Sequence, residues 1–174
     1  RERGQPHAPE TKGRGGSMAD TVRSGMFKLR PSSSGDVDRI LDIWRRAVDA
    51  THDFLLPEDR AAIEHEVAAF FPEVNFVLVV DASDTPQGFM FLQDGHLEAL
   101  FVDPDQRGKG IGKALVQAAL ADHPALTTDV NEQNFEAAGF YRRMGFEATG
   151  RSPLDGQGRP YPLIHLRYRA RLVE

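Results

Sequence analysis

The chain has no cysteine among its 174 residues. Disulfides, thiolate nucleophiles and cysteine-ligated metal sites are therefore excluded. The sequence also has no apolar run close to the ~20 residues that a membrane-spanning helix needs, so we expect no membrane partner. No spacing of His, Asp and Glu is typical of a metal site, and we expect no metal. Absence of cysteine fits a reducing compartment, so we expect a cytoplasmic protein.

Several common catalytic and nucleotide motifs are also missing. No Gly-x-Ser-x-Gly elbow is present, which argues against a serine acyl-enzyme. A Walker loop fails because Ala114 follows Gly112-Lys113 where Ser or Thr is required. The dinucleotide fingerprint fails because its third glycine falls on Lys113. A nucleotide-binding protein is therefore a distant alternative.

Charge is unevenly distributed along the chain. Residues 1–25 carry a net charge of +2, which leaves −7 for residues 26–174 out of a total of −5. The negative charge of residues 26–174 does not attract nucleic acid, although it is compatible with cationic amine substrates. Residues 1–25 also lack a periodic apolar pattern, so we expect a disordered tail. Residues 26–174, in a chain that is 40% apolar, are enough for one domain with its own core.

The most informative segment runs from residue 97 to residue 121. A short apolar strand, 97–102, leads through a turn to Arg107-Gly-Lys-Gly-Ile-Gly112, and a helical pattern follows. The glycines allow the backbone to approach a ligand closely. The free N–H groups at the start of the helix, with its positive dipole end behind them, favour an anion. These residues therefore predict a phosphate-binding site.

The remaining pattern predicts antiparallel strands first and strand–helix–strand units afterwards, which is a mixed α+β fold with helices on both faces of the sheet. Imperfect alternation along 97–102 indicates a β-bulge. Expected strands cover 27–30, 76–80, 88–92, 97–102, 126–130, 146–151 and 163–168, and expected helices cover 37–48, 57–71, 111–121 and 134–144.

A second motif lies between Asn131 and Gly145-Phe146. Asn134, Ala137 and Tyr141 follow one another at spacings of three and four, which places them on one face of a helix. Two interpretations remain open from spacing alone. The three side chains face a ligand, or Tyr141 belongs to the core and Asn134 caps the turn into the helix.

Together these motifs resemble those of the GNAT superfamily of N-acetyltransferases. Arg107, Gly110 and Gly112 match the Arg/Gln-x-x-Gly-x-Gly/Ala pattern of its coenzyme A pyrophosphate loop, and N-x-x-A-x-x-x-Y-x-x-x-G-F matches its second acetyl-CoA motif. The resemblance covers nearly all of residues 27–169 and is closest to the YjaB-type acetyltransferases. The stretches that carry this closer similarity are 44–55, 88–90, 130–134 and 158–163.

The resemblance implies a mostly antiparallel sheet of six or seven strands. Its central parallel strands, 97–102 and 126–130, splay apart to admit acetyl-CoA as cosubstrate. The implied coenzyme ligands are the main chain of Leu100, Phe101 and Val102, the loop residues Arg107, Gly108, Lys109, Gly110, Ile111, Gly112 and Lys113, and the helix residues Asn134, Ala137 and Tyr141.

The expected chemistry is direct attack of a primary amine on acetyl-CoA, with no acyl-enzyme. Tyr141 is the candidate acid, because a phenol can protonate the departing sulfur. Glu98, on the central strand, is the candidate base. A strand carboxylate that faces solvent or pairs with an arginine is the alternative for Glu98, and His96 is a rival base.

The acceptor amine is expected between the first two helices, where His52 and Asp53 lie, with Asn131 as a further contact. A protein lysine, a protein N-terminus and a small-molecule amine all remain open, as do a monomer and a homodimer. The alternative to an enzyme is a catalytically silent GNAT-like module that binds acyl-CoA.

Overall fold

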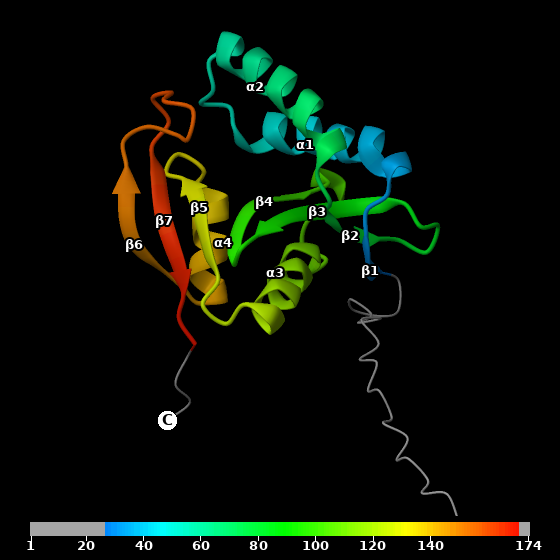
Figure 1. Cartoon of the computed structure of the whole chain (residues 1–174). Helices are drawn as coiled ribbons and strands as arrows, with labels where there is room; N and C mark the ends of the chain where they lie inside the picture. Colours follow the sequence, from blue (N-terminus) through cyan, green and yellow to red (C-terminus); the bar gives the residue numbers. More distant parts are fainter. Residues whose placement is uncertain (1–26, 171–174) are drawn as a thin grey trace, which may run out of the picture.

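The computed structural model describes residues 27–170. The tail expected at 1–25 lies outside the described residues. The strands are β1 Lys28–Pro31, β2 Val77–Val80, β3 Pro86–Gln93, β4 His96–Val102, β5 Thr127–Asn131, β6 Phe146–Ser152 and β7 Leu163–Tyr168. The helices are α1 Val37–Thr51, α2 Pro57–Phe70, α3 Ile111–Asp122 and α4 Phe135–Met144 (Figure 1). Each element lies close to its predicted position.

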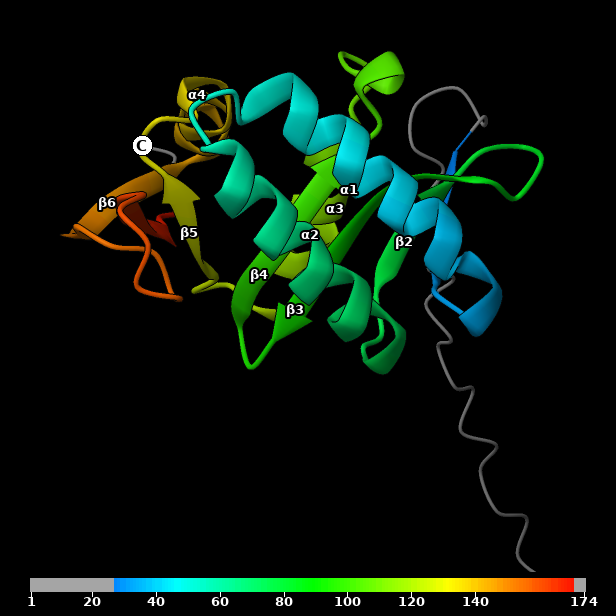
Figure 2. The ribbon, with the colours of Figure 1, turned by 90° about the horizontal axis from the view of Figure 1, so that it is seen from above.

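Within residues 27–170, the seven strands form one sheet in the order β1-β2-β3-β4-β5-β7-β6. Every pairing is antiparallel except that of β4 with β5. Helices α1 and α2 cross one face of the sheet, while α3 and α4 lie against the other (Figure 2). This arrangement confirms the expected mixed α+β fold of the GNAT type. Within residues 27–170, no helix is long and apolar enough to cross a bilayer.

Each face of the sheet has its own hydrophobic core. Side chains alternate between the faces along a strand, so Phe89 of β3 packs towards α1 while the next residue, Met90, packs towards α3. The core under α1 includes Trp44, and the core under α3 and α4 includes Tyr141. Helix α2 has no fully buried residue. It packs on the core under α1 through partly buried side chains such as Ile63 and Val67.

The parallel pair β4–β5 is very short. Only His96 with Thr127 and Leu97 with Thr128 are paired, after which the two strands separate. On its other side β4 pairs with β3 up to Val102, and Glu98 is the extra residue of a bulge opposite Phe91 and Leu92. The predicted splay and bulge are therefore both present. Beyond Leu97 the edge of β4 that faces β5 is unpaired.

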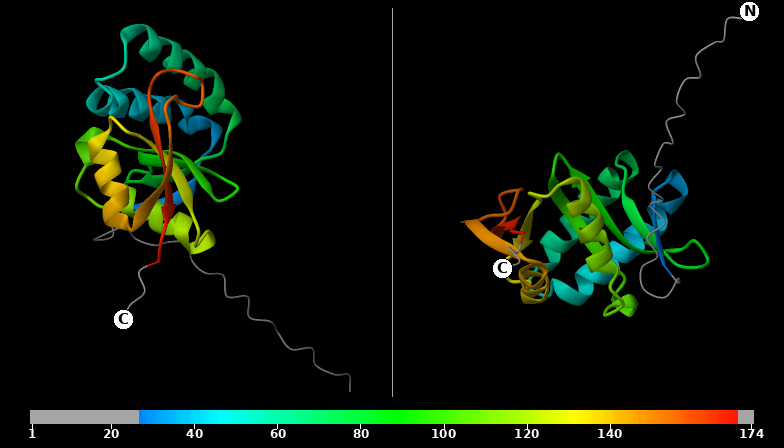
Figure 3. Two further views of the ribbon diagram at one scale, coloured as in Figure 1. Left: turned by 90° about the vertical axis from the view of Figure 1, so that its left-hand side faces the viewer. Right: turned by 90° about the horizontal axis from the view of Figure 1, so that it is seen from below.

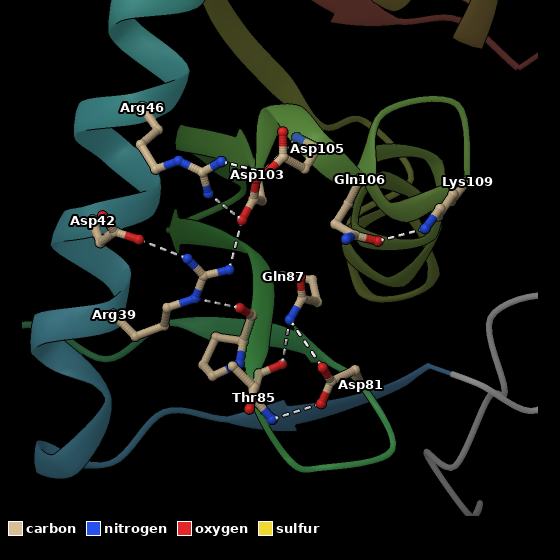
Figure 4. A network of polar contacts seen from close by, with 11 residues as sticks. Arg39, Asp42, Arg46, Asp81, Thr85, Gln87, Asp103, Asp105, Gln106 and Lys109 are labelled. Atoms are coloured by element: carbon tan, nitrogen blue, oxygen red, sulfur yellow. Dashed lines mark hydrogen bonds and ion pairs between the residues drawn. The ribbon is translucent and has the colours of Figure 1, made fainter.

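A buried carboxylate fixes the end of β4 against α1. Asp103 is 3% exposed, and its Oδ2 accepts hydrogen bonds from Arg39 Nη2 at 2.7 Å and Arg46 Nη1 at 2.6 Å (Figure 4). Its Oδ1 accepts from the Asp105 N–H at 2.9 Å, which caps the turn before the glycine loop. Burial alone raises the pKa of Asp103, but the hydrogen bonds of Arg39 and Asp105 and the charge of Arg46 outweigh it, so the pKa lies below its ordinary value.

We expect Asp103→Asn to lower the free energy of unfolding by about 2 kcal/mol, since it removes a buried charge partner of two arginines. A carboxyl with a lowered pKa stabilises the fold above its unfolded pKa of ~3.9, and this stabilisation is lost as pH falls below that value. The variant should therefore lose part of the acid dependence of stability. Urea unfolding at pH 7 and at pH 3 measures both effects.

Asp42→Asn is the matched control, because Asp42 also pairs with Arg39 but its side chain is 49% exposed. Its loss should cost less than about 1 kcal/mol. Equal destabilisation by the two variants would contradict the anchoring role of Asp103.

Candidate functional site

A cleft of about 380 Å³ opens where β4 and β5 separate. It collects all but two of the predicted coenzyme ligands, namely Leu100, Phe101, Val102, Arg107, Gly108, Gly110, Ile111, Gly112, Lys113, Asn134 and Ala137. The two exceptions are Lys109 and Tyr141. Segments that are far apart in the sequence therefore converge on one site.

At one end of the cleft the glycine loop presents main-chain N–H groups. Gly108 and Gly110 have φ of 77° and 80°, a left-handed conformation that favours glycine. Gly110 is the N-cap of α3, and the first N–H bonded within the helix is that of Ala114, to the Gly110 carbonyl. The N–H groups of residues 111–113 are therefore available to an anion.

Cationic side chains surround the same end of the cleft. Arg107, Lys113 and Arg143 line it, and Arg107 Nη1 lies 3.3 Å from Glu136 Oε2. Lys109 does not line the cleft itself, and its Nζ donates at 2.8 Å to the Oε1 of Gln106, which does line it (Figure 4). The charge at this end suits a diphosphate.

Along the middle of the cleft, the unpaired edge of β4 offers main-chain donors and acceptors. Leu100, Phe101 and Val102 all line the cleft beyond the last β4–β5 pair. Such an edge can bind an extended ligand as if the ligand were an additional strand. The opposite wall belongs to α4, where Asn134 is the N-cap and its Oδ1 accepts from the Ala137 N–H at 3.2 Å. Asn134 therefore caps the helix and also lines the cleft.

Tyr141 lies beneath the cleft, in the core. It is 7% exposed, and its ring centroid is 5.1 Å from that of Phe140 and 5.3 Å from that of Phe146. Burial raises the pKa of Tyr141 to about 12, and a hydrogen bond with Thr128 offsets part of that rise. Thr128 belongs to the last β4–β5 pair, so the Tyr141 hydroxyl is near the point where the strands part. At neutral pH this phenol keeps its proton.

Glu98 does not line the cleft. It faces a second cavity of about 340 Å³ between α2 and the sheet. The other lining residues are mostly aromatic or aliphatic: Trp44, Val67, Phe70, Phe71, Phe76, Phe91, Gln93, Ala99 and Phe101. Phe101 lines both cavities. The predicted base therefore belongs to the neighbouring cavity.

The C-terminal end of α1 forms part of the cleft wall. Thr51 and His52 both line it, and Thr51 Oγ1 lies 2.7 Å from His52 Nδ1. Burial lowers the pKa of His52, and the charge of Asp53 offsets only part of this shift. Asp53 itself is exposed and does not line the cleft. His52 is therefore a neutral imidazole at pH 7.

The remaining predicted acceptor contact and the rival base lie outside both cavities. Asn131 ends β5, where its Oδ1 accepts from the Gln133 N–H at 3.0 Å. His96 Nδ1 lies 2.7 Å from Thr127 Oγ1, and its Nε2 lies 3.4 Å from Asp129 Oδ2. On the same face, Asp129 also contacts His165, and His165 contacts Ser152. These residues form a polar surface of β4–β7 rather than part of the cleft.

A loop from the far side of the sheet is joined to the connection between α1 and α2. The β6–β7 loop reaches towards α1 and α2 (Figure 3). The Leu56 N–H donates to the Tyr161 phenol oxygen at 3.0 Å, and Arg159 Nη2 lies 2.8 Å from Glu66 Oε1. The Tyr161 hydroxyl in turn donates to Asp59. These contacts fix the corner that carries His52.

Several cleft residues escaped the sequence analysis: Ala47, Thr51, Gln106, Glu136, Phe140 and Arg143. On α4, positions 136, 140 and 143 are spaced by four and three, so they share a face. That face is adjacent to the one carrying Asn134, Ala137 and Tyr141. The sequence spacing shows that these three residues share a face of α4. It does not show that this face borders the cleft, because that depends on how α4 packs against the sheet.

Comparisons with known proteins agree with this geometry. Residues 49–159 match the model of the acetyltransferase (GNAT) domain family. The chain is 52% identical over 143 residues to peptidyl-lysine N-acetyltransferase YjaB of Salmonella typhimurium, covering 82% of this chain and 99% of that protein. It is 48% identical to YjaB of Escherichia coli, covering 82% and 97% respectively.

Solved structures give the same result. The solution structure of the apo form of E. coli YjaB superposes with a TM-score of 0.79 over 82% of this chain and 97% of that one. The structure of PaiA N-acetyltransferase from Thermoplasma acidophilum in complex with coenzyme A superposes with a TM-score of 0.58. The superposition covers 82% of this chain and 99% of that one, and at 19% sequence identity it shows a shared fold. On the family match, the identity over most of its length and the shared fold, this chain belongs to the GNAT acetyltransferase family.

Proposed function

We propose that this protein transfers the acetyl group of acetyl-CoA to the side-chain amine of a lysine in a protein acceptor. The observation that carries the proposal is the convergence of a glycine loop, a cationic rim and an unpaired strand edge on one cleft. The GNAT family uses acetyl-CoA, and the relatives of 48–52% identity are named peptidyl-lysine N-acetyltransferases.

In this proposal each part of the coenzyme has a matching part of the cleft. The diphosphate binds the N–H groups of residues 107–113, close to Arg107 and Lys113. The pantetheine arm runs along β4, where residues 100–102 supply main-chain hydrogen bonds, and the Asn134 amide faces it from α4. The thioester then lies near the point where β4 and β5 part, above Tyr141.

The second cavity fits a lysine side chain. A lysine has an apolar stem and a cationic head, and it buries the stem along apolar surface while its charge seeks a carboxylate or an aromatic face. The cavity offers aromatic walls from Phe70, Phe91 and Phe101 and one carboxylate, Glu98. Because Phe101 also lines the coenzyme cleft, an amine in this cavity can reach the thioester past that side chain.

The chemical step is then a direct transfer. The lysine ammonium first releases one proton to solvent, and the neutral amine nitrogen then attacks the thioester carbonyl carbon. A main-chain N–H of β4 near Leu100 stabilises the oxyanion, an effect of about 3–4 kcal/mol in other acyl-transfer sites. The C–S bond breaks as the intermediate collapses. The departing sulfur takes the phenol proton of Tyr141, and the amine nitrogen gives up a proton to a base.

Gly110→Ala is expected to weaken acetyl-CoA binding about fivefold to tenfold, because an alanine at φ 80° costs about 1 kcal/mol and distorts the loop. Calorimetric titration with CoA measures the change. Gly35→Ala is the matched control, since nothing lies within 4 Å of the added methyl group and its φ is not positive. Unchanged affinity in the Gly110 variant would argue against diphosphate binding at the loop.

A lysine-containing peptide with a blocked N-terminus tests the acceptor. The wild type should release coenzyme thiol with this peptide and not with the same peptide carrying norleucine, and mass spectrometry should find the acetyl group on lysine. Glu98→Gln should raise KM for the peptide about tenfold through loss of the ion pair, with KM for acetyl-CoA unchanged. Faster turnover with small amines than with any lysine peptide would overturn the proposed acceptor.

Tyr141→Phe is expected to lower kcat by about 10²-fold or more, the usual contribution of a proton donor, while CoA affinity stays within twofold. The aromatic packing with Phe140 and Phe146 is retained, so the melting temperature should change little. Steady-state rates, calorimetry and thermal unfolding separate these effects. An equal turnover number in the variant would remove Tyr141 from the chemistry.

A further inference from the structure

We propose that His52 is the catalytic base, accepting the amine proton at Nε2, and that Thr51 is a positioning residue that holds His52 in the required tautomer. This proposal rests on the proposed acetyl transfer to an amine. The sequence predicts Glu98 as the base, but in this proposal Glu98 pairs with the incoming ammonium in the second cavity, whereas His52 lines the coenzyme cleft, where the thioester is attacked.

The tautomer follows from counting hydrogen-bond donors. A threonine hydroxyl has one proton, and Thr51 Oγ1 donates it to the Ala47 carbonyl at 2.8 Å, one turn earlier in α1. The contact of 2.7 Å between Thr51 Oγ1 and His52 Nδ1 must therefore be an Nδ1–H donating to the hydroxyl. A neutral imidazole has only one N–H. Nε2 consequently carries a lone pair and can accept a proton.

The surroundings of His52 keep the ring in place and neutral. Its ring centroid lies 5.2 Å from that of Phe54, and Phe54 lies 6.0 Å from Tyr161, which is bonded to the main chain at Leu56. Asp53 is the charged group that acts on the ring, and the other charged residues that line the cleft are Arg107, Lys113, Glu136 and Arg143. Burial outweighs the attraction of Asp53, so the pKa of His52 lies below its ordinary value.

Proton transfer from the amine accompanies transfer of the acetyl group. The amine nitrogen forms a bond to the acetyl carbon and gives its proton to His52 Nε2, so the imidazole becomes imidazolium. The C–S bond breaks, and the sulfur takes the proton of the Tyr141 hydroxyl. His52 then releases its proton to solvent and Tyr141 regains one, which leaves an acetylated amine and free coenzyme thiol.

Thr51→Val tests the positioning role, since valine keeps the shape of threonine but accepts no hydrogen bond. We expect kcat to fall about threefold to tenfold, the effect of one neutral hydrogen bond, with KM for acetyl-CoA within twofold. Thr51→Ser, which restores the hydroxyl, should retain wild-type kcat. His52→Gln should lower kcat at least about 100-fold and abolish the acid limb of the kcat/KM profile, which in the wild type should lie below pH 6.5.

Nitrogen-15 NMR of the histidine rings reads the tautomer without any acceptor. The wild type and Thr51→Ser should show His52 protonated at Nδ1, and Thr51→Val should shift towards the other tautomer. An Nε2–H tautomer in the wild type, or full turnover by His52→Gln, would overturn the proposal. His65→Gln is the comparison variant, since His65 is exposed on α2 and lines neither cavity, and it should keep wild-type turnover. A loss as large as that of His52→Gln would also overturn the proposal.

The two proposals fail in different ways. If the wild type does not acetylate lysine peptides, the proposed acceptor is wrong, whereas the NMR measurement still tests the pairing of Thr51 with His52. If lysine is acetylated and His52→Gln turns over normally, the proposed function stands and the assignment of the base is wrong. Thermal unfolding of each variant shows whether a lost activity reflects a lost fold.

Discussion

The site depends on the short pairing between β4 and β5. Two parallel pairs, His96 with Thr127 and Leu97 with Thr128, join the two halves of the sheet before the strands diverge. These pairs lie at the start of both strands, and beyond them the edge of β4 is free to bind a ligand. Thr128 supports the junction by donating from Oγ1 to the Leu97 carbonyl at 2.8 Å. If the β4–β5 pairing were longer, β5 would bond to the main-chain groups of β4 that are now free along the cleft.

Much of the fold was predictable because its signals are local. Glycines at 108, 110 and 112 between a strand and a helix specify a turn with few conformational solutions, and the helical spacing of residues 134, 137 and 141 specifies one face of α4. Those residues do lie around one junction in the structure. The bulge was also visible as broken alternation, since one extra residue moves the following side chains to the opposite faces.

The differences concern the direction in which side chains point. Glu98 is predicted beside the thioester, and in the structure it is the extra residue of the bulge and lines the second cavity. Lys109 is predicted at the phosphates, and in the structure its Nζ donates to Gln106. Thr51 was not predicted, and it lines the cleft because α1, which crosses the sheet in Figure 2, ends there. A sequence pattern defines a face of a helix or strand, whereas such contacts depend on how distant elements pack.

Helix α1 links the two ends of the site. Its residues Arg39 and Arg46 hold Asp103 beside the glycine loop, and its last turn carries Thr51 next to His52. The length and rotation of α1 therefore set the position of the His52 imidazole relative to the anion-binding end of the cleft. Each residue of an α-helix advances about 1.5 Å and turns about 100°. Inserting one residue between 46 and 51 would leave the clamp on Asp103 intact and swing the imidazole a quarter turn out of the cleft.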